Sequence, residues 1–280
     1  MKILTADAEQ GVAEAQFFLG VMYKEGQGVS LDYNEALKWY RLAAKQGYGA
    51  GKANIYRLAK YDTSQALKIL TSDAEQGVAE AQVMLGKMHE EGHHFPKNYI
   101  IAFNWYKRAA TQGNVPGKLH LYKIAKKGVP KALKILIDDA RRGVAQAQFH
   151  LGFMYKNGHQ FPQDNDEAFR WYQLSANQGY VHAQLHLGQM YEKGEAVPQN
   201  YDEAVRRYRF GAEIGIGEAQ FRLGLMYYKG QGVPQDYVLA DMWFILSSIR
   251  KIKEATKYRS LVENKMSPQQ IEKAQLMARN

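Results

Sequence analysis

The stretch EQGVAEAQFFLGVMY (9–23) decides the fold, because it returns along the chain. It recurs as EQGVAEAQVMLGKMH (75–89) and RRGVAQAQFHLGFMY (141–155), and each copy begins 66 residues after the one before. Two further copies, NQGYVHAQLHLGQMY (177–191) and EIGIGEAQFRLGLMY (213–227), follow at steps of 36 residues. A fixed period of this kind is the signature of a repeat architecture. We therefore expect an array of similar units rather than one globular core.

A glycine near the start of each copy, together with two glycines between copies, marks the start of a unit. These glycines are Gly11, Gly47, Gly77, Gly113, Gly143, Gly179 and Gly215. The intervals between them are 36, 30, 36, 30, 36 and 36 residues, so the units that begin at Gly47 and Gly113 are shortened. The spacing from Ala36 to Gly47 equals that from Ala66 to Gly77, which predicts that the loss falls in the connecting loop and not in a helix.

Each unit has the pattern of two helices. In the first copy Ala15, Leu19 and Met22 form an apolar stripe of helical period, and Gly26 stands where that helix should end. The second helix of each long unit opens on a residue whose side chain can cap backbone N–H groups, namely Asp32, Asn98, Asp164, Asn200 and Asp236. A glutamate three residues later predicts a capping box at Glu35, Glu167 and Glu203.

One helix pair cannot bury its own apolar faces, so the pairs must stack into a continuous core. The fold class predicted is therefore all-α, an α-solenoid of helix-turn-helix repeats. Residues 1–10 match the end of a second helix or form an N-terminal cap, residues 11–251 hold seven helix pairs, and residues 252–280 are expected to form C-terminal capping helices. Within that last segment, Ser267 followed by Pro268 is typical of a helix start.

The phrases AEQG-x3-AQ-x2-LG-x-MY-x2-G-x-GV and DY-x2-A-x2-WY-x2-AA-x-QG resemble the Sel1-like repeat, a relative of the tetratricopeptide repeat. The resemblance covers about residues 8–250 and implies a right-handed superhelix, an adaptor role in protein–protein interaction and, in bacterial members, frequent export or action at the host interface. Some cysteine-rich relatives are described as β-lactamase-like, but this chain has no cysteine. It also departs from the repeat pattern in the two short units, at Arg207 in the tryptophan position, and after Ser248, where the closing Gln-Gly is lost.

Composition excludes several classes of protein. The absence of cysteine excludes disulfides, thiol catalysis and cysteine-ligated zinc. No apolar run approaches the roughly 18 residues of a membrane span, and the beginning of this chain has no signal-peptide pattern. The net charge of +9 favours acidic partners in general. Localisation stays open between an exported protein and the bacterial cytoplasm.

The stretch HEEGHH (89–94) matches the H-E-x-x-H pattern of zinc hydrolases, in which both histidines lie on one helical face. Here Gly92 is expected to end the helix before His93, and His89 takes a position that tyrosine holds in other copies. We interpret the match as a coincidence. The paired carboxylates Asp138 and Asp139 lie on an expected helix surface. The sequence therefore predicts no catalytic residue, no metal site, no cofactor and no small-molecule substrate.

Positions that differ between copies mark the surface on which a partner could bind. The resemblance implies that the first helices line the concave side, and two positions there project away from the expected core. The first of them holds Phe18, Met84, His150, His186 and Arg222, and the second holds Val21, Lys87, Phe153, Gln189 and Leu225. Large apolar side chains at exposed positions are typical of interaction surfaces, although packing against neighbouring helices explains them equally well.

Two classes of function follow. The favoured one is a non-enzymatic scaffold or adaptor that binds a protein or peptide, of acidic character, in the groove. The alternative is a helical-repeat nucleic-acid-binding protein, prompted by the net charge and by clusters such as Lys126-Lys127 and Arg206-Arg207. Repeats that read RNA carry specifying side chains at fixed positions. No such code is evident at the variable positions, so nucleic acid is the less favoured partner.

Overall fold

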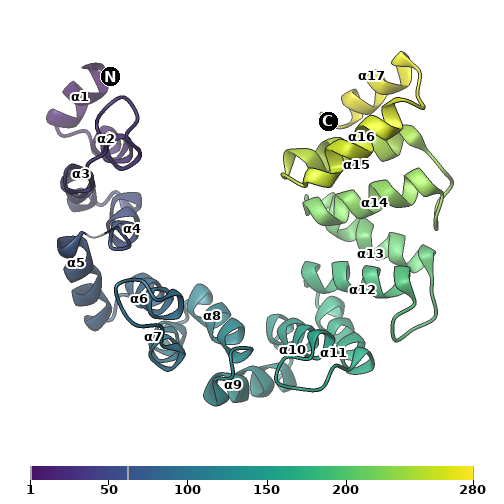
Figure 1. Ribbon diagram of the computed structural model, residues 1–280, viewed down its shortest axis with the longest axis horizontal. Helices are drawn as coiled ribbons and strands as arrows, with labels where there is room; N and C mark the ends of the chain where they lie inside the picture. Colours follow the sequence, from purple (N-terminus) through teal and green to yellow (C-terminus); the bar gives the residue numbers. More distant parts are fainter. Residues whose placement is uncertain (1, 62, 280) are drawn as a thin grey trace. The chain divides into compact units, whose positions relative to one another are not determined.

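The computed structural model describes residues 2–61 and 63–279, and within them it contains 17 helices joined by short loops and no strand (Figure 1). The chain divides into two compact units, with the boundary between Ile135 and Leu136. Within each unit, consecutive helices pack against one another in pairs and are joined by short connections. The predicted all-α solenoid of stacked helix pairs is confirmed.

The helices alternate between the first and second members of pairs. Up to the unit boundary they are α1 (Lys2–Glu9), α2 (Ala13–Glu25), α3 (Tyr33–Lys45), α4 (Gly49–Leu58), α5 (Ser64–Glu75), α6 (Ala79–Glu91), α7 (Tyr99–Thr111) and α8 (Val115–Ala125), while α9 (Pro130–Arg141) contains the boundary. Beyond it follow α10 (Ala145–Asn157), α11 (Asn165–Asn177), α12 (Val181–Lys193), α13 (Tyr201–Glu213), α14 (Gly217–Lys229), α15 (Tyr237–Ile249), α16 (Lys253–Glu263) and α17 (Pro268–Met277).

In each long pair an aromatic ring of the second helix lies against a glycine of the first. A Cβ atom on Gly86 would lie 2.6 Å from the ring of Tyr106, and one on Gly188 would lie 2.6 Å from the ring of Tyr208. The same contact joins Gly20 with Tyr40, Gly152 with Tyr172, and Gly224 with Phe244. All five rings are fully buried. Close packing of this kind leaves no space for a methyl group at the glycine.

The two short pairs reverse this arrangement. Tyr56 and Tyr122 take the glycine position of the first helix, and Leu70 and Leu136 take the position of the aromatic ring; all four side chains are buried. The tyrosine hydroxyl of Tyr56 donates to the Asp73 carboxylate at 2.5 Å. In the short pairs the ring that fills the space between the two helices therefore belongs to the first helix, whereas in the long pairs it belongs to the second.

The shortening does not fall in the loop alone, so that prediction is wrong. The first helices α4 and α8 have 10 and 11 residues where α2 has 13, and the second helices α5 and α9 have 12 where α3 has 13. The long first helices end at a left-handed glycine such as Gly26, with a φ of 67°. The helices α4 and α8 end instead at Ala59 and Lys126 in right-handed conformation. These two helices therefore end two or three residues earlier than α2, and the left-handed glycine that follows α8, Gly128 with a φ of 78°, lies beyond its cap.

The predicted caps of the second helices are confirmed, because each of the five Asp or Asn side chains accepts a backbone N–H of the first turn. The expected capping boxes are not formed. Glu35, Glu167 and Glu203 pair instead with cations one turn later, such as Lys38 at 3.3 Å from Glu35. Among the described helices the reciprocal box is recorded at α17, between Ser267 and Gln270.

A buried glutamine ties each long pair to the helix before it. Gln82 donates from its amide to the carbonyl of Ala74 at 3.0 Å, and its own carbonyl accepts from Gln112 at 2.9 Å. Gln16 and Gln148 repeat both bonds. In the α12–α13 pair, Arg207 replaces the second glutamine and donates to the Gln184 carbonyl at 3.0 Å. The arginine in the tryptophan position therefore completes a hydrogen bond that Ile214, in the place of Gln46, cannot supply.

The last two helices pack on the repeat array. Ala255 and Val262 of α16 are buried in one cluster with Phe221 and Phe244, and α17 packs against α15. Of the helices described, none combines the length and the apolar character that crossing a membrane requires.

Candidate partner-binding faces

Within each unit, the first helices of successive pairs present equivalent positions on one face. The residue in the position of Phe18 meets the tyrosine of the pair before it. His120 of α8 stacks on Tyr106 at 4.7 Å between ring centroids, and His186 of α12 stacks on Tyr172 at 5.0 Å. The face is therefore built from first-helix side chains over the buried aromatic rings.

In the first unit the expected residues differ in exposure. Phe18 is 45% exposed and makes an edge contact with Phe17 at 5.4 Å. Val21 and Met84 are half-buried and pack against the core around Leu37 and Leu85. Their role is thus at least partly structural, whereas Phe18 remains available at the surface.

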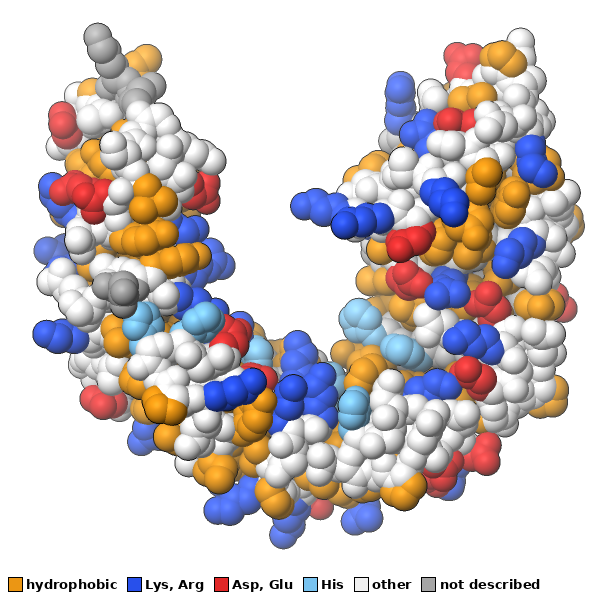
Figure 2. Space-filling view, in the orientation of Figure 1, with side chains coloured by type: hydrophobic (Ala, Val, Ile, Leu, Met, Phe, Trp, Pro, Cys, Tyr) orange, Lys and Arg blue, Asp and Glu red, His pale blue; other side chains and the backbone are white. Residues whose placement is uncertain are grey.

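In the second unit, histidines and aromatic residues lie together on α10 and α12, and the space-filling view shows histidines beside hydrophobic side chains (Figure 2). His186 is surrounded by Phe149 at 5.5 Å, Phe153 at 6.3 Å and Tyr172. His150 makes an edge contact with Phe149 at 5.3 Å. All of these except Tyr172, which is fully buried, are half-buried, so they form a surface with limited exposed apolar area.

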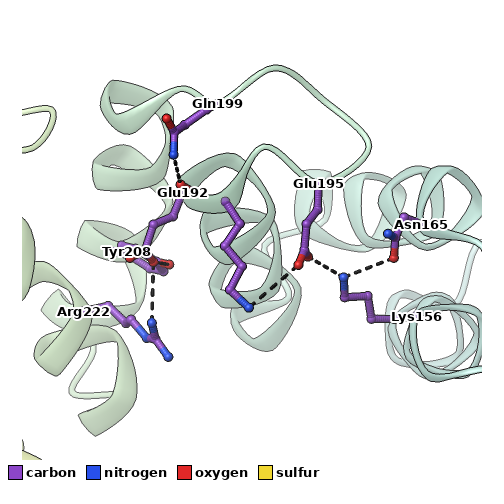
Figure 3. Close-up of polar contacts among 8 residues, drawn as sticks. Lys156, Asn165, Glu192, Glu195, Gln199, Tyr208 and Arg222 are labelled. Atoms are coloured by element: carbon purple, nitrogen blue, oxygen red, sulfur yellow. Dashed lines mark hydrogen bonds and ion pairs between the residues drawn. The ribbon is translucent and has the colours of Figure 1, made fainter.

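Charged groups farther along this unit neutralise one another (Figure 3). Arg222 lies 2.9 Å from Glu218 and 3.6 Å from Glu192, and Glu192 also accepts the hydroxyl of Tyr208 at 2.5 Å. Lys156 contacts Glu195 and donates to Asn165 at 3.1 Å. Arg222 and Lys156 are therefore paired within the protein.

Leu225 does not project from the core, and the expectation that it does is wrong. It is 7% exposed and packs in the cluster with Phe221, Phe244 and Val262. The reason is α16, which covers α14 at the end of the array. Gln189, the equivalent residue of α12, is half-exposed.

Burial shifts the pKa of two histidines on these faces. Desolvation lowers the pKa of His120 to about 4, with the nearby cations Lys87 and Lys123 adding to the shift. Desolvation also lowers the pKa of His186 to about 4, with His182 and Lys156 adding to it. A buried imidazole disfavours the charged form, so both side chains are neutral at pH 7.

The tyrosine hydroxyls meet different partners along the array. Where the first helix carries a glutamate near its end, the hydroxyl donates to it, as in Tyr106 to Glu90 at 2.6 Å. Tyr208 and Glu192 repeat this bond. Where that position is Lys24 or Lys156, the hydroxyls of Tyr40 and Tyr172 are buried and have no hydrogen-bond partner among the described residues.

A comparison of the long copies alone misses one feature of the first unit. Counted from the glycine that opens each unit, Arg57, Lys87 and Lys123 hold one position, on α4, α6 and α8. Arg57 and Lys123 are exposed and Lys87 is half-buried. We call these three side chains the basic row. Aligning the short units on Gly47 and Gly113 would have shown it.

The HEEGHH stretch lies across the end of α6. Gly92 follows the helix with a φ of 84°, and His93 lies beyond it, 3.0 Å from Glu91. His89 stacks on Phe95 at 4.3 Å. The two histidines therefore do not share a helical face, and in the described part of the chain no three His, Cys, Asp or Glu side chains form a group that could hold a metal.

Stacked helix pairs with glycine-to-aromatic contacts define a helical-repeat protein. The sequence model of the Sel1 repeat family matches residues 13–48, 79–114, 145–180, 181–214 and 217–248, more than half of the chain. The protein belongs to the Sel1 repeat family, whose members generally act as protein–protein interaction scaffolds. The two short pairs lie largely outside the matched segments.

Known proteins similar to this chain include bacterial and fungal ones. Chitin synthase regulatory factor 3 of Schizosaccharomyces pombe is 30% identical over 195 residues, covering 61% of this chain and 21% of the relative. An uncharacterised protein of Neisseria meningitidis serogroup B is 30% identical over 184 residues, covering 63% of this chain and 38% of the relative. The chain thus spans well under half the length of these relatives.

A solved structure of a Sel1 repeat protein from Oxalobacter formigenes is similar to the whole fold. It is 26% identical with a TM-score of 0.58, and the match covers 93% of this chain and 79% of that one. The similarity supports the assignment of the helix pairs to the Sel1 repeat.

Proposed function

We propose that this chain is a non-enzymatic scaffold that binds a protein or peptide partner on the faces of its first helices. The observation that carries the proposal is Phe18, a large aromatic side chain 45% exposed on that face. Exposed aromatic residues are enriched in protein interfaces. The binding array comprises the seven pairs of residues 11–251, and residues 252–280 serve as its cap.

We propose that the partner is acidic and, from the resemblance to bacterial Sel1-like repeat proteins, that this chain is exported and acts at the host interface. Support for the acidic character comes from the net charge of +9 and from the unpaired cations of the first unit. Phe18, Met84 and Lys87 in the first unit and His150, Phe153, His186, Gln189 and Arg222 in the second remain proposed contact residues. Val21 contributes through its partly exposed surface.

Affinity capture with the purified chain as bait tests this function, compared with a variant that carries Phe18→Ala and Phe153→Ala. Loss of specific proteins with the variant supports the proposal, because removing aromatic anchors costs binding energy. Equal capture by both baits would place the interface elsewhere.

The net charge also keeps nucleic acid as a second candidate. A gel-shift titration against salt distinguishes the two. Phosphate contacts release counterions, so nucleic-acid binding weakens steeply as salt rises. Tight, salt-sensitive binding of RNA or DNA would reverse the order of the two candidates.

A further inference from the structure

The basic row combines three cations for which the described residues supply no ion-pair partner. None of Arg57, Lys87 and Lys123 has an ion-pair partner within residues 2–61 and 63–279. Arg57, Lys87 and Lys123 each stand ten residues after the glycine that opens their unit, so they hold the same position on the first helices α4, α6 and α8. The array therefore presents one unpaired cation on each of three successive first helices.

Acidic side chains near the row are already engaged or distant. Glu90 accepts the hydroxyl of Tyr106 and lies 3.9 Å from His120, and Glu91 lies 2.6 Å from Lys60 and 3.0 Å from His93. Glu25 lies 3.8 Å from Lys24. Glu14 and Glu80 lie in the first turns of α2 and α6, at the other end of these helices.

A second observation comes from the pair that precedes the row. The buried hydroxyl of Tyr40 lacks a hydrogen-bond partner, whereas the equivalent hydroxyl of Tyr106 donates to Glu90. Lys24 replaces that glutamate in the first pair. In the first pair a cation therefore stands where the next pair supplies a carboxylate.

The spacing of the row sets the form of the ligand. The helices α4 and α6, and α6 and α8, pack directly against each other, and packed helices lie about 8–10 Å apart. In a polyproline-II segment, side chains three residues apart point to the same side and are separated by about 9 Å. In a β-strand, side chains two residues apart point to the same side and are separated by about 7 Å. A polyproline-II chain therefore matches the row with an acidic residue at every third position.

We propose, building on the scaffold function above, that α4, α6 and α8 bind a segment of a partner protein in polyproline-II conformation, with acidic side chains three residues apart that pair with Arg57, Lys87 and Lys123. Next to the row, α2 offers the exposed ring of Phe18, which suits an apolar residue at one end of the segment. The combination of three cations and an apolar neighbour favours a peptide over nucleic acid.

Fluorescence anisotropy with the full chain tests the proposal. The probe is a fluorescein-labelled peptide of neutral polar residues with glutamate at positions 1, 4 and 7. The controls are a peptide with the same glutamates placed consecutively, a peptide with lysines instead, and a labelled oligothymidylate. The test variant carries Arg57→Gln, Lys87→Gln and Lys123→Gln. Its matched control carries Arg41→Gln, Lys68→Gln and Lys107→Gln, which removes the same charges from exposed sites on α3, α5 and α7.

We expect the spaced peptide to bind, with a Kd raised about tenfold or more in the row variant and changed less than about twofold in the control variant. The consecutive and lysine peptides should bind more weakly. Equal Kd values for the two variants, or equal binding of the spaced and consecutive peptides, would overturn the proposal. Tighter binding of the oligothymidylate that is lost in the row variant would assign the row to nucleic acid instead. If the spaced peptide does not bind while affinity capture still depends on Phe18, the scaffold function is retained and the acidic segment is ruled out as its ligand.

Discussion

The two units present chemically different faces on the same helical framework. In the first unit the position of Val21 is basic in three successive helices, and those cations have no ion-pair partner among the described residues. In the second unit the same position holds Phe153, Gln189 and Leu225, and nearby charges such as Arg222 pair with Glu192 and Glu218. The comparison teaches that the repeat fixes the core while a few variable positions set the binding chemistry.

The shared core gives the largest expected effect. Replacing Gly86 in the first unit or Gly188 in the second by alanine brings a Cβ to 2.6 Å from a buried tyrosine ring. We expect each change to lower the free energy of unfolding by about 1–3 kcal/mol, measured by urea denaturation. Gly49→Ala is the control, because nothing lies within 4 Å of its added Cβ. Equal stability of all three variants would contradict the packing account.

Acid should destabilise both units through their buried histidines. The folded pKa of His120 and of His186 is about 4, below the usual value near 6.5. Below pH 6.5 the unfolded chain therefore binds protons that the folded chain does not, and stability falls as the pH drops toward 4. The loss is on the order of 1–3 kcal/mol per group. Denaturation at pH 7 and pH 5 measures it, and His186→Phe should reduce the difference; an unchanged difference would exclude this histidine as a source.

Removing a tyrosine hydroxyl should change the free energy of unfolding in opposite directions at two sites within each unit. Tyr106→Phe and Tyr208→Phe remove hydroxyls that donate to Glu90 and Glu192, at a cost of about 1 kcal/mol each. Tyr40→Phe and Tyr172→Phe remove buried hydroxyls without a recorded acceptor, so stability should stay the same or rise. Thermal or urea unfolding of the four variants gives the sign. A similar loss in all four would show that the two kinds of site do not differ.

The smallest expected effect concerns surface charges. Lys156→Ala breaks the contacts with Glu195 and Asn165 in the second unit and should cost about 0.2–1 kcal/mol, less at high salt. Lys87→Ala in the first unit removes a cation without an ion-pair partner and should leave stability within about 0.3 kcal/mol. A double-mutant cycle with Glu195→Ala isolates the pair energy, and a coupling of zero would show that Lys156 is not neutralised there.

Much of the fold could be predicted because its determinants repeat. The returning AQ-x2-LG-x-MY phrase and the Asp or Asn caps predicted the helix pairs, their ends and the family. Where the short units lose their six residues could not be predicted from spacing alone, because the end of the first helix depends on its cap, Gly26 in α2 and Ala59 in α4. The loss falls partly in the helices and partly in the loop, which shortens from residues 26–32 to residues 59–63.

The candidate faces were harder to predict than the fold. A helical wheel placed Leu225 outside the core, but α16 covers it, and that contact is long-range in sequence. The position of Phe18 was expected to be exposed in every copy, yet His186 stacks on Tyr172 from the pair before it. The basic row was visible only after the short units were aligned. Which of the remaining positions contact a partner stays a prediction.

Photo-crosslinking tests the central claim, that the face of the first unit binds an acidic segment, most directly. The spaced glutamate peptide carries a benzophenone at one end, and mass spectrometry maps the crosslinked residues of the full chain. The account predicts adducts on α4, α6 and α8, at residues 49–125, and their loss in the Arg57, Lys87 and Lys123 variant. Adducts concentrated on α10, α12 and α14, or unchanged in that variant, would contradict it.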